Sequence, residues 1–184
     1  CRHYPDAMRY HSFPRNSWRR DAVFLQFGDS PGSHWLGPDT MLNRCAAAFG
    51  DGRAQSFAAE LLAAEVTCDS APFLNLLWRD TTVKGAGPER LPTFRHFEDM
   101  GIVVMRSDWS GNENMLAMKC GASAGHLAQQ RYRHNIGGGH MHPSAGVIQL
   151  FAHGSHLLLH TGYTFKQTEH ANTLLVNGKG QIGE

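Results

Sequence analysis

Apolar residues recur along this chain at two different spacings, and the change lies close to residue 87. From about residue 38 to residue 77 they recur at intervals of three and four, the spacing of one face of a helix. The pattern predicts one helix from Pro38 or Asp39 to Phe49, a second that ends near Val66, and a third from Ser70 to Leu77. The glycines at 50 and 52 separate the first two, which suggests antiparallel helical hairpins. Residues 1–35 show no sustained period and are interpreted as extended, irregular chain.

The second half of the chain has the pattern of short strands. It follows a Gly- and Pro-rich stretch at 85–92, which is the best candidate for a linker. The expected strands are Phe94–Phe97, Ile102–Met105, Met115–Lys119, Val147–Phe151, Leu157–Leu159 and Thr173–Val176. Many short strands at this spacing are typical of an antiparallel sandwich, and about ninety residues are too few for a complete one.

Composition and charge exclude several classes of protein. Seventeen Lys and Arg against sixteen Asp and Glu give a net charge of +1, which removes the electrostatic case for binding nucleic acid or an anionic membrane. No apolar stretch approaches the roughly 18–20 residues that a membrane span needs. The four cysteines contain no C-x-x-C pair and do not indicate a disulfide scaffold.

Histidine is the unusual residue, with twelve copies, seven of them between His134 and His170. Alternate side chains share a face of an extended segment, so His140 and His142 are expected to point the same way. His156 and His160 are expected to share a strand face, and His170 precedes the next expected strand. Imidazoles from neighbouring strands, about 4.8 Å apart, can converge on one zinc ion. The alternative is a hydrogen-bonded histidine rim on the sheet.

Several segments, taken in order, resemble the heparinase II/III-like polysaccharide lyases. The resemblance is strongest over residues 93–184 and is specific because the segments occur in the family's order. The segments are Phe27-Gly28-Asp29-Ser30, Gly101-Ile102-Val103-Val104-Met105-Arg106-Ser107-Asp108-Trp109, Lys119-Cys120-Gly121, Gly139-His140-Met141-His142-Pro143, His160-Thr161-Gly162-Tyr163 and Asn172-Thr173-Leu174-Leu175-Val176-Asn177-Gly178-Lys179-Gly180-Gln181.

The resemblance implies an α+β multidomain architecture. Residues 1–87 would be the end of an (α/α) toroid, and residues 88–184 the N-terminal part of an incomplete antiparallel β-sandwich. We therefore expect the chain to be a window of a longer protein.

The resemblance also implies a reaction. Members of the family cleave uronic-acid polysaccharides such as alginate, heparin or heparan sulfate by β-elimination. A neutralised C6 carboxylate acidifies the C5 proton, a base removes that proton, and the 4-linked oxygen leaves with help from an acid. The implied partner is an acidic polysaccharide or oligosaccharide, and the implied location is the bacterial periplasm or the exterior.

Site residues follow from the same resemblance. His140 corresponds to the histidine that reaches into the cleft, where it helps bind the carboxylate or move the proton. His142, His160 and His170 are the implied ligands of a divalent metal, expected to be zinc. His160 stands where the family usually has an aspartate, and its third ligand usually occupies position 171, which here is Ala171. Ser144 replaces a further aspartate, so a three-imidazole site and a degraded site both stay open.

The remaining catalytic groups of the family, a tyrosine and an Asn or His, lie in the toroid and would precede Cys1. We therefore predict that these 184 residues alone are inactive, and no substrate-binding residue is assigned. Two other functions compete: a non-catalytic carbohydrate-binding or structural relative with a degraded metal site, and a histidine-rich metal-storage or metal-sensing module.

Overall fold

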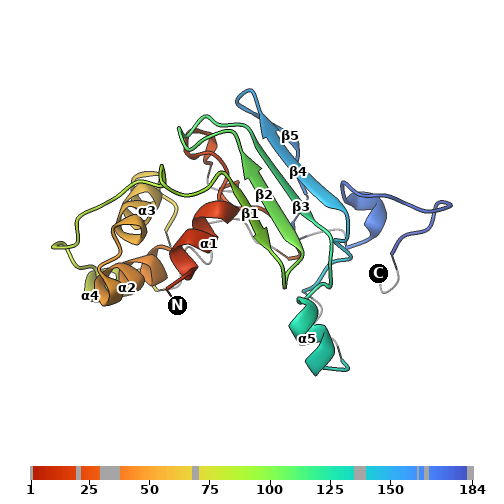
Figure 1. The fold of residues 1–184 in the computed structure, drawn as a ribbon, viewed down its shortest axis with the longest axis horizontal. Helices are drawn as coiled ribbons and strands as arrows, with labels where there is room; N and C mark the ends of the chain where they lie inside the picture. Colours follow the sequence, from red (N-terminus) through yellow and green to blue (C-terminus); the bar gives the residue numbers. More distant parts are fainter. Residues whose placement is uncertain are drawn as a thin grey trace. The chain divides into compact units, whose positions relative to one another are not determined.

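The computed structural model describes residues 2–19, 22–29, 38–67, 71–134, 140–160, 162–163 and 166–181. They belong to two compact units, one mainly helical and one built on a sheet (Figure 1). The helical unit consists of Cys1–Phe24, Pro31–Leu91 and Trp109–Gly111, and the sheet unit of Leu25–Ser30, Pro92–Asp108 and Asn112–Glu184. The fold is therefore α+β. The predicted domain limits of 1–87 and 88–184 stay a prediction. The two units do not follow these limits strictly, because residues 25–30 belong to the sheet unit and residues 88–91 and 109–111 belong to the helical unit.

The helical unit contains the three predicted helices and one that the pattern missed. The predicted helices are α2 (Asp39–Phe49), α3 (Gly52–Ala63) and α4 (Phe73–Trp78). The expected start of the third helix at Ser70 lies outside the described residues, as do Cys1, Cys68, Gly139 and Thr161. The turn between α2 and α3 is built by Gly50, with φ of 62°, and by Asp51, which caps α3. The Asp51 carboxylate accepts from the backbone N–H groups of Arg53 at 2.9 Å and Ala54 at 3.2 Å.

Helix α1 (Tyr4–His11) and the 3-10 turn η1 (Arg15–Ser17) correct the expectation that residues 1–35 are irregular and extended. Eight residues hold too few apolar repeats for a period to show, and an isolated helix of this length is unstable in water. Tertiary contacts stabilise it instead. The Arg9 guanidinium lies 3.9 Å from the centre of the Phe57 ring and 2.7 Å from a Glu60 carboxylate oxygen.

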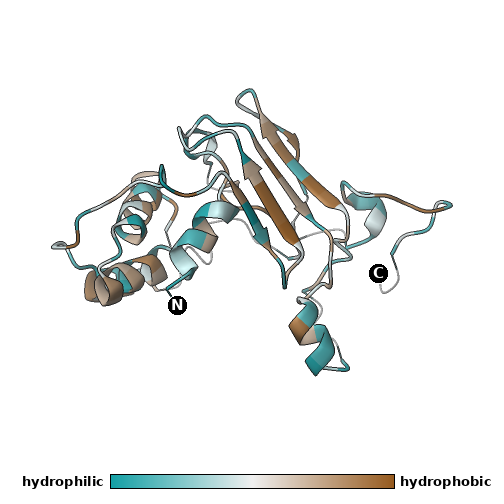
Figure 2. Cartoon of the chain, viewed as in Figure 1, coloured by the Kyte–Doolittle hydropathy of each residue, from teal (hydrophilic) through white to brown (hydrophobic). Residues whose placement is uncertain are grey.

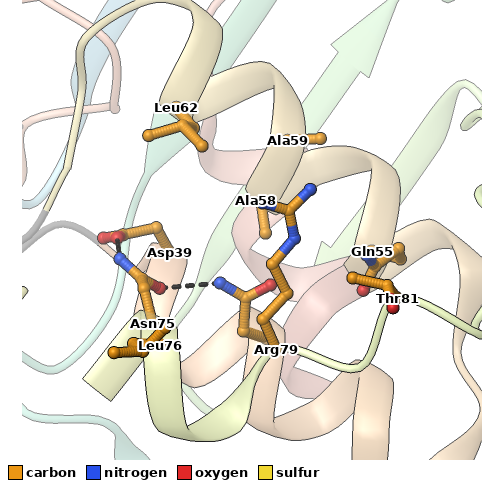
Figure 3. A pocket seen from close by; sticks show the side chains of 10 residues that line it. Asp39, Gln55, Ala58, Ala59, Leu62, Asn75, Leu76, Arg79 and Thr81 are labelled. Carbon is orange, nitrogen blue, oxygen red and sulfur yellow. Dashed lines mark hydrogen bonds between the residues drawn. The ribbon is translucent and has the colours of Figure 1, made fainter. Parts of the chain in front are cut away.

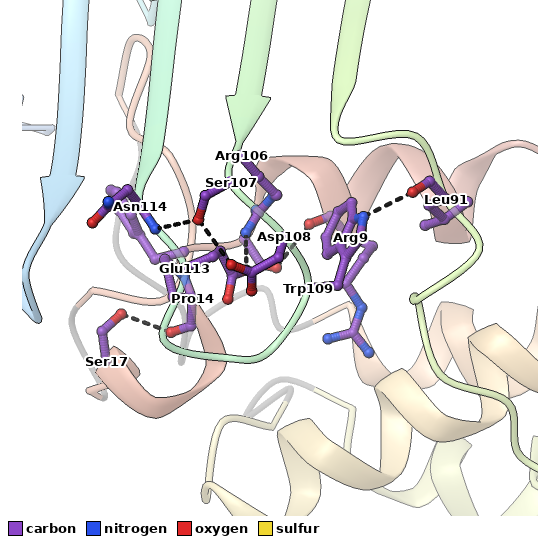
Figure 4. Close-up of polar contacts among 12 residues, drawn as sticks. Arg9, Pro14, Ser17, Leu91, Arg106, Ser107, Asp108, Trp109, Glu113 and Asn114 are labelled. Carbon is purple, nitrogen blue, oxygen red and sulfur yellow. Dashed lines mark hydrogen bonds and ion pairs between the residues drawn. The ribbon is translucent and has the colours of Figure 1, made fainter.

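A small apolar core holds the helical unit together. It is formed by Val23, Leu42, Cys45, Ala46, Ala54, Phe57, Ala58, Leu61 and Val66. Most of its members come from the facing sides of α2 and α3, the helices that the period of three and four predicts. At another point of the same unit, the Trp109 indole N–H donates to the Leu91 carbonyl at 2.9 Å (Figure 4).

The sheet unit is a five-stranded antiparallel meander whose strands follow one another in chain order. The strands are β1 (Phe94–Phe97), β2 (Ile102–Arg106), β3 (Met115–Lys119), β4 (Val147–Ala152) and β5 (Ser155–Leu158). The first four confirm the sequence pattern, and β5 begins two residues earlier than expected because the turn is only His153-Gly154. Two corrections follow. A short helix, α5 (His126–Arg131), lies between β3 and β4, and residues 173–176 form no strand, since Val176 makes only an isolated bridge with Lys179.

Apolar side chains occupy both faces of this sheet. One face is buried and carries Val104, Ala117 and Gln149 in one cross-strand row. On the other face the register aligns Phe94, Met105, Leu116, Leu150 and Leu158, which are half-buried or exposed. Figure 2 shows the apolar colouring of the central strands. An antiparallel sheet with one wet face normally alternates apolar and polar residues. The pattern here is that of a sheet inside a sandwich, and the second sheet stays a prediction.

A buried ion pair closes the connection between β2 and β3. The Arg106 guanidinium donates to a Glu113 carboxylate oxygen at 2.7 Å, and both side chains are almost fully buried (Figure 4). Ser107 supports the same connection, because its hydroxyl donates to Asp108 and accepts from the Asn114 backbone N–H. Among the described residues, no helix is long and apolar enough to cross a membrane.

Candidate functional site

The candidate site begins with the segment Leu25–Asp29, which lies in the sheet unit although the helical unit precedes and follows it in sequence. A buried glutamine on β4 holds this segment in place. The Gln149 amide donates to the Gln26 carbonyl at 3.0 Å, and its oxygen accepts from the Gln26 backbone N–H at 3.2 Å. Gln149 therefore binds Gln26 as a neighbouring strand would. Three residues farther on, the Asp29 N–H donates to the His140 carbonyl at 3.1 Å.

Gly28 lets this segment approach the histidine motif closely. Its φ is +80°, a conformation that L side chains rarely adopt, and a Cβ at this position would lie 3.0 Å from the His140 carbonyl oxygen. Because residue 28 has no side chain, the backbone at residues 28–29 can lie directly against the His140 backbone.

The Asp29 carboxylate is the centre of the site. Its side chain is only 3% exposed. One oxygen, Oδ2, lies 2.9 Å from His140 Nδ1 and 3.1 Å from Lys166 Nζ, and the other, Oδ1, is hydrogen-bonded to His142 Nε2. Burial by itself raises the pKa of Asp29, but the hydrogen bonds from His142, Lys166 and His140 outweigh it and lower the pKa to about 2. The carboxylate is therefore ionised at neutral pH.

His140 is the exposed member of this cluster. Its side chain is 64% exposed, and its Nδ1 is occupied by Asp29, so Nε2 is the ring nitrogen available to a ligand. The Tyr163 ring lies beside it, with ring centroids 6.5 Å apart, and Tyr163 is half exposed. The Lys166 ammonium is held by the same Asp29 oxygen, and its side chain is 45% exposed. A proton acceptor, a phenol and a cation thus share one surface of the sheet unit.

His142 and His160 form a buried pair beneath that surface. Their ring centroids are 5.5 Å apart, and each residue is 3% exposed. His142 Nδ1 is buried and has no hydrogen-bond partner among the described residues. His160 Nδ1 accepts the Gly162 N–H at 3.0 Å. Burial lowers the pKa of His160, and the neighbouring His142 lowers it further, so this imidazole is neutral at neutral pH.

The fit of a metal to these residues is incomplete. Zinc in proteins takes three or four protein ligands. His142 Nδ1 is suited to be one of them, whereas the Nδ1 lone pair of His160 is used by Gly162. His170 lies in the 3-10 turn η2 (Thr168–His170), is exposed, and has its Nε2 3.6 Å from a Glu169 carboxylate oxygen. In the part of the chain that the structure describes, no three His, Cys, Asp or Glu side chains form a group that could hold a metal ion. The His142, His160 and His170 zinc site stays a prediction.

Sequence reasoning missed two members of the cluster. Asp29 lies in one of the segments that carry the family resemblance, but nothing local indicates that residues 111 and 113 positions later bind its carboxylate. Lys166 has no distinguishing pattern around it. Only the three-dimensional structure identifies Asp29 and Lys166 as members of the cluster, because their hydrogen bonds join segments far apart in the chain.

A concave feature lies in the helical unit, between α2, α3 and α4. It is a cavity of about 430 Å³ that contains none of the predicted site residues (Figure 3). The Asn75 amide donates to the buried Asp39 carboxylate, and the Asn43 amide donates to the Asn75 oxygen at 2.7 Å. Leu62 and Leu76 supply much of its apolar wall. The described residues of this lining include no histidine, cysteine or lysine, so they offer fewer groups for acid–base chemistry than the Asp29 cluster.

The structural comparisons point to one kind of fold. The chain is similar to the heparan sulfate lyase HepC from Pedobacter heparinus and to a mutant of that enzyme, each with a TM-score of 0.53 and 17% identity over 96% of this chain and 24% of the lyase. It is also similar to a heparinase III with methylated lysines, with a TM-score of 0.50 and 19% identity over 94% of this chain and 23% of that one. The chain thus spans about a quarter of the length of these structures. No protein-family model and no curated protein sequence matches it. The similarity is one of fold.

Substitution of Gly28 tests whether the close approach matters. Gly28→Ala is expected to destabilise the sheet unit by about 1–3 kcal/mol, because a non-glycine residue at positive φ is strained and the new Cβ meets the His140 carbonyl. The His140 imidazole resonances are expected to shift as well. Urea unfolding and nuclear magnetic resonance measure the two effects.

Gly154→Ala is the matched control for this substitution. Gly154 has φ of +76°, but no atom of the described residues, other than its two chain neighbours, lies within 4 Å of its Cβ position. It should show the backbone strain without a shift at His140. Equal effects of the two substitutions on His140 would contradict the role given to Gly28.

Proposed function

We propose that this chain is part of a polysaccharide lyase that cleaves uronic-acid-containing glycans by β-elimination. The observation that carries the proposal is the geometry of His140, which has one ring nitrogen bound to a buried carboxylate and the other exposed beside a cation. The fold similarity to heparan sulfate lyases supports the same reaction class.

In this proposal His140 Nε2 acts at the C5 proton of a uronate. The base takes the proton, the C5–H electron pair forms the C4=C5 double bond, the C4–O bond breaks, and the departing oxygen is protonated. The sugar carboxylate must be neutralised for the C5 proton to become acidic, and cations close to the base favour that. Lys166, 3.1 Å from the same Asp29 oxygen as His140, is a cation in that position.

In this proposal the family's other catalytic groups, a tyrosine and an Asn or His, belong to the toroid, and no residue of this chain is assigned to them. The toroid itself, like the second sheet, belongs to the proposal. The heparan sulfate lyases among the similar structures favour heparan sulfate or heparin over alginate as the substrate. Action on an extracellular polymer places the enzyme in the periplasm or outside the cell. No step of the proposed reaction passes through a metal.

A non-catalytic carbohydrate-binding relative is the second candidate function. It is favoured by the incomplete ligand set, because the described residues hold no group of three metal-binding side chains. Three departures from the family pattern concern the predicted metal ligands. His160 is one of these ligands, Ser144 follows His142 by two residues, and Ala171 is next to His170. This candidate predicts binding of acidic oligosaccharides without any chemical change in them.

An elimination assay with the full-length gene product that contains this chain separates the two. The protein is mixed with heparan sulfate, heparin or alginate, and the unsaturated uronate is followed by its ultraviolet absorbance and by mass spectrometry. We expect product with a C4=C5 double bond from at least one of these polymers and none from the 184-residue chain alone. Binding without product would favour the non-catalytic candidate, and hydrolysed, saturated ends would exclude elimination.

A further inference from the structure

One buried carboxylate serves two imidazoles and an ammonium in this site. Asp29 Oδ2 is shared by His140 Nδ1 and Lys166 Nζ, and Oδ1 is used by His142 Nε2. The position of this carboxylate is fixed, because the Asp29 side chain is only 3% exposed and the Asp29 backbone N–H donates to the His140 carbonyl. The Gln149 amide holds the same segment three residues earlier.

The hydrogen-bonding capacity of a carboxylate constrains the two imidazoles. An ionised carboxylate only accepts hydrogen bonds, so each ring nitrogen that faces it must carry a proton. His140 faces Asp29 with Nδ1, and His142 faces it with Nε2. The neutral rings are therefore opposite tautomers. The lone pair of His140 is on Nε2, and the lone pair of His142 is on Nδ1.

We propose that Asp29 is a positioning residue that holds His140 as its Nδ1–H tautomer, so that the exposed Nε2 is the proton acceptor, and that holds His142 as its Nε2–H tautomer. Free neutral histidine in water prefers the Nε2–H form, so His140 is expected to be in the less common state. The catalytic role of Asp29 rests on the proposed elimination. The assignment of the two tautomers rests only on the geometry of Asp29.

The arrangement also explains why a carboxylate is needed at position 29. An asparagine has one accepting and one donating end, and it cannot accept from both imidazoles. Because Lys166 can only donate, the amide oxygen is expected on the side shared by Lys166 and His140. The amide NH₂ then faces His142 Nε2, which must become an acceptor. Alanine at position 29 accepts from neither ring.

Nuclear magnetic resonance of the 184-residue chain tests the tautomers directly. Two-bond ¹H–¹⁵N correlation spectra of histidine-labelled protein distinguish the two ring nitrogens, and a pH of about 9 keeps free imidazole neutral. His140→Gln and His142→Gln variants assign the two residues. We expect the proton of His140 on Nδ1 and the proton of His142 on Nε2. A proton on Nε2 of His140 overturns the proposal, even without any further variant.

Variants of Asp29 supply the causal test. Asp29→Asn is expected to leave His140 unchanged and to move the His142 proton to Nδ1, whereas Asp29→Ala is expected to return His140 to the Nε2–H form. Asp99→Asn is the matched control, since Asp99 lies in the same unit and accepts from the Leu127 backbone N–H at 2.8 Å instead. If neither imidazole changes in Asp29→Asn, or if His140 is unchanged in Asp29→Ala, Asp29 does not set the tautomers.

The catalytic part of the inference is measured on the full-length protein. Asp29→Ala is expected to lower kcat at least tenfold with a much smaller change in KM, because it removes the correctly oriented acceptor without removing His140. An unchanged kcat overturns the catalytic part. If no polymer is cleaved by the parent protein while the tautomers are as expected, the proposed function fails and the positioning of the two imidazoles stands.

Discussion

Replacing His140 by glutamine in the full-length protein is expected to lower the rate of the proposed β-elimination by about 10²- to 10⁴-fold, the usual contribution of a positioned general base. Glutamine keeps a polar side chain of similar length but cannot take a proton at neutral pH. The Asp29 carboxylate stays ionised through its contacts with His142 and Lys166, so the site is expected to keep its fold. The quantity to measure is kcat for formation of the unsaturated product.

His96→Gln is the control for this experiment. His96 is also exposed and lies in the same unit as His140, in the edge strand β1. Its substitution should leave kcat within experimental error of the parent. If His140→Gln retained more than about a tenth of the parental kcat, His140 would not be the base, because loss of a general base costs more than that.

Replacing Glu113 by alanine is expected to destabilise the sheet unit by about 3–5 kcal/mol, the usual cost of removing one member of a buried ion pair. The Arg106 and Glu113 side chains are 1% and 3% exposed and are joined at 2.7 Å, so Glu113→Ala leaves the guanidinium buried without this carboxylate. A loss of this size is a large fraction of the roughly 5–15 kcal/mol that a domain possesses. The measurement is urea unfolding followed through the hydrogen exchange of the β2 and β3 amides. The urea concentration at the midpoint of unfolding is expected to fall by at least about 1 M.

Two further variants show whether the buried charge is the cause. Asp108→Ala removes an exposed carboxylate from the same connection and is expected to change stability by less than about 0.5 kcal/mol. The double variant Arg106→Met with Glu113→Leu removes both charges and is expected to recover most of the lost stability. A double variant as unstable as Glu113→Ala would show that lost packing, and not the removal of one charge of the pair, dominates the loss of stability.

The elements that the sequence predicted well are those whose signal is local. Helices α2 and α3 bury only part of the apolar set that recurs at three and four, namely Leu42, Cys45, Phe57 and Leu61, whereas Met41 and Phe49 are exposed. The turn between the two helices is marked by Gly50 and capped by Asp51. The strands β1 to β4 coincide with apolar runs separated by turn residues. Each of these signals lies within about a dozen residues of chain, so the sequence alone carries it.

The elements that were missed lack such a local signal. Helix α1 is too short to show a period and depends on Arg9 contacts with Phe57 and Glu60, which are about fifty residues away. The pattern at 173–176 resembled a strand, but a strand needs a partner, and Val176 pairs only with Lys179 in an isolated bridge. The expectation that His156 and His160 share a strand face fails because β5 ends at Leu158.

Local sequence signals account for the α+β class, most of the helices and strands, and the position of the histidine-rich segment around His140 and His142. These features depend on composition, on apolar period and on turn chemistry, which are properties of neighbouring residues. The presence of Asp29 and Lys166 beside those histidines follows from the fold, because the hydrogen bonds of Asp29 to His140, His142 and Lys166 span 111 to 137 positions of sequence. A buried carboxylate needs its donors close in space, not in sequence, and it is folding that brings them to it.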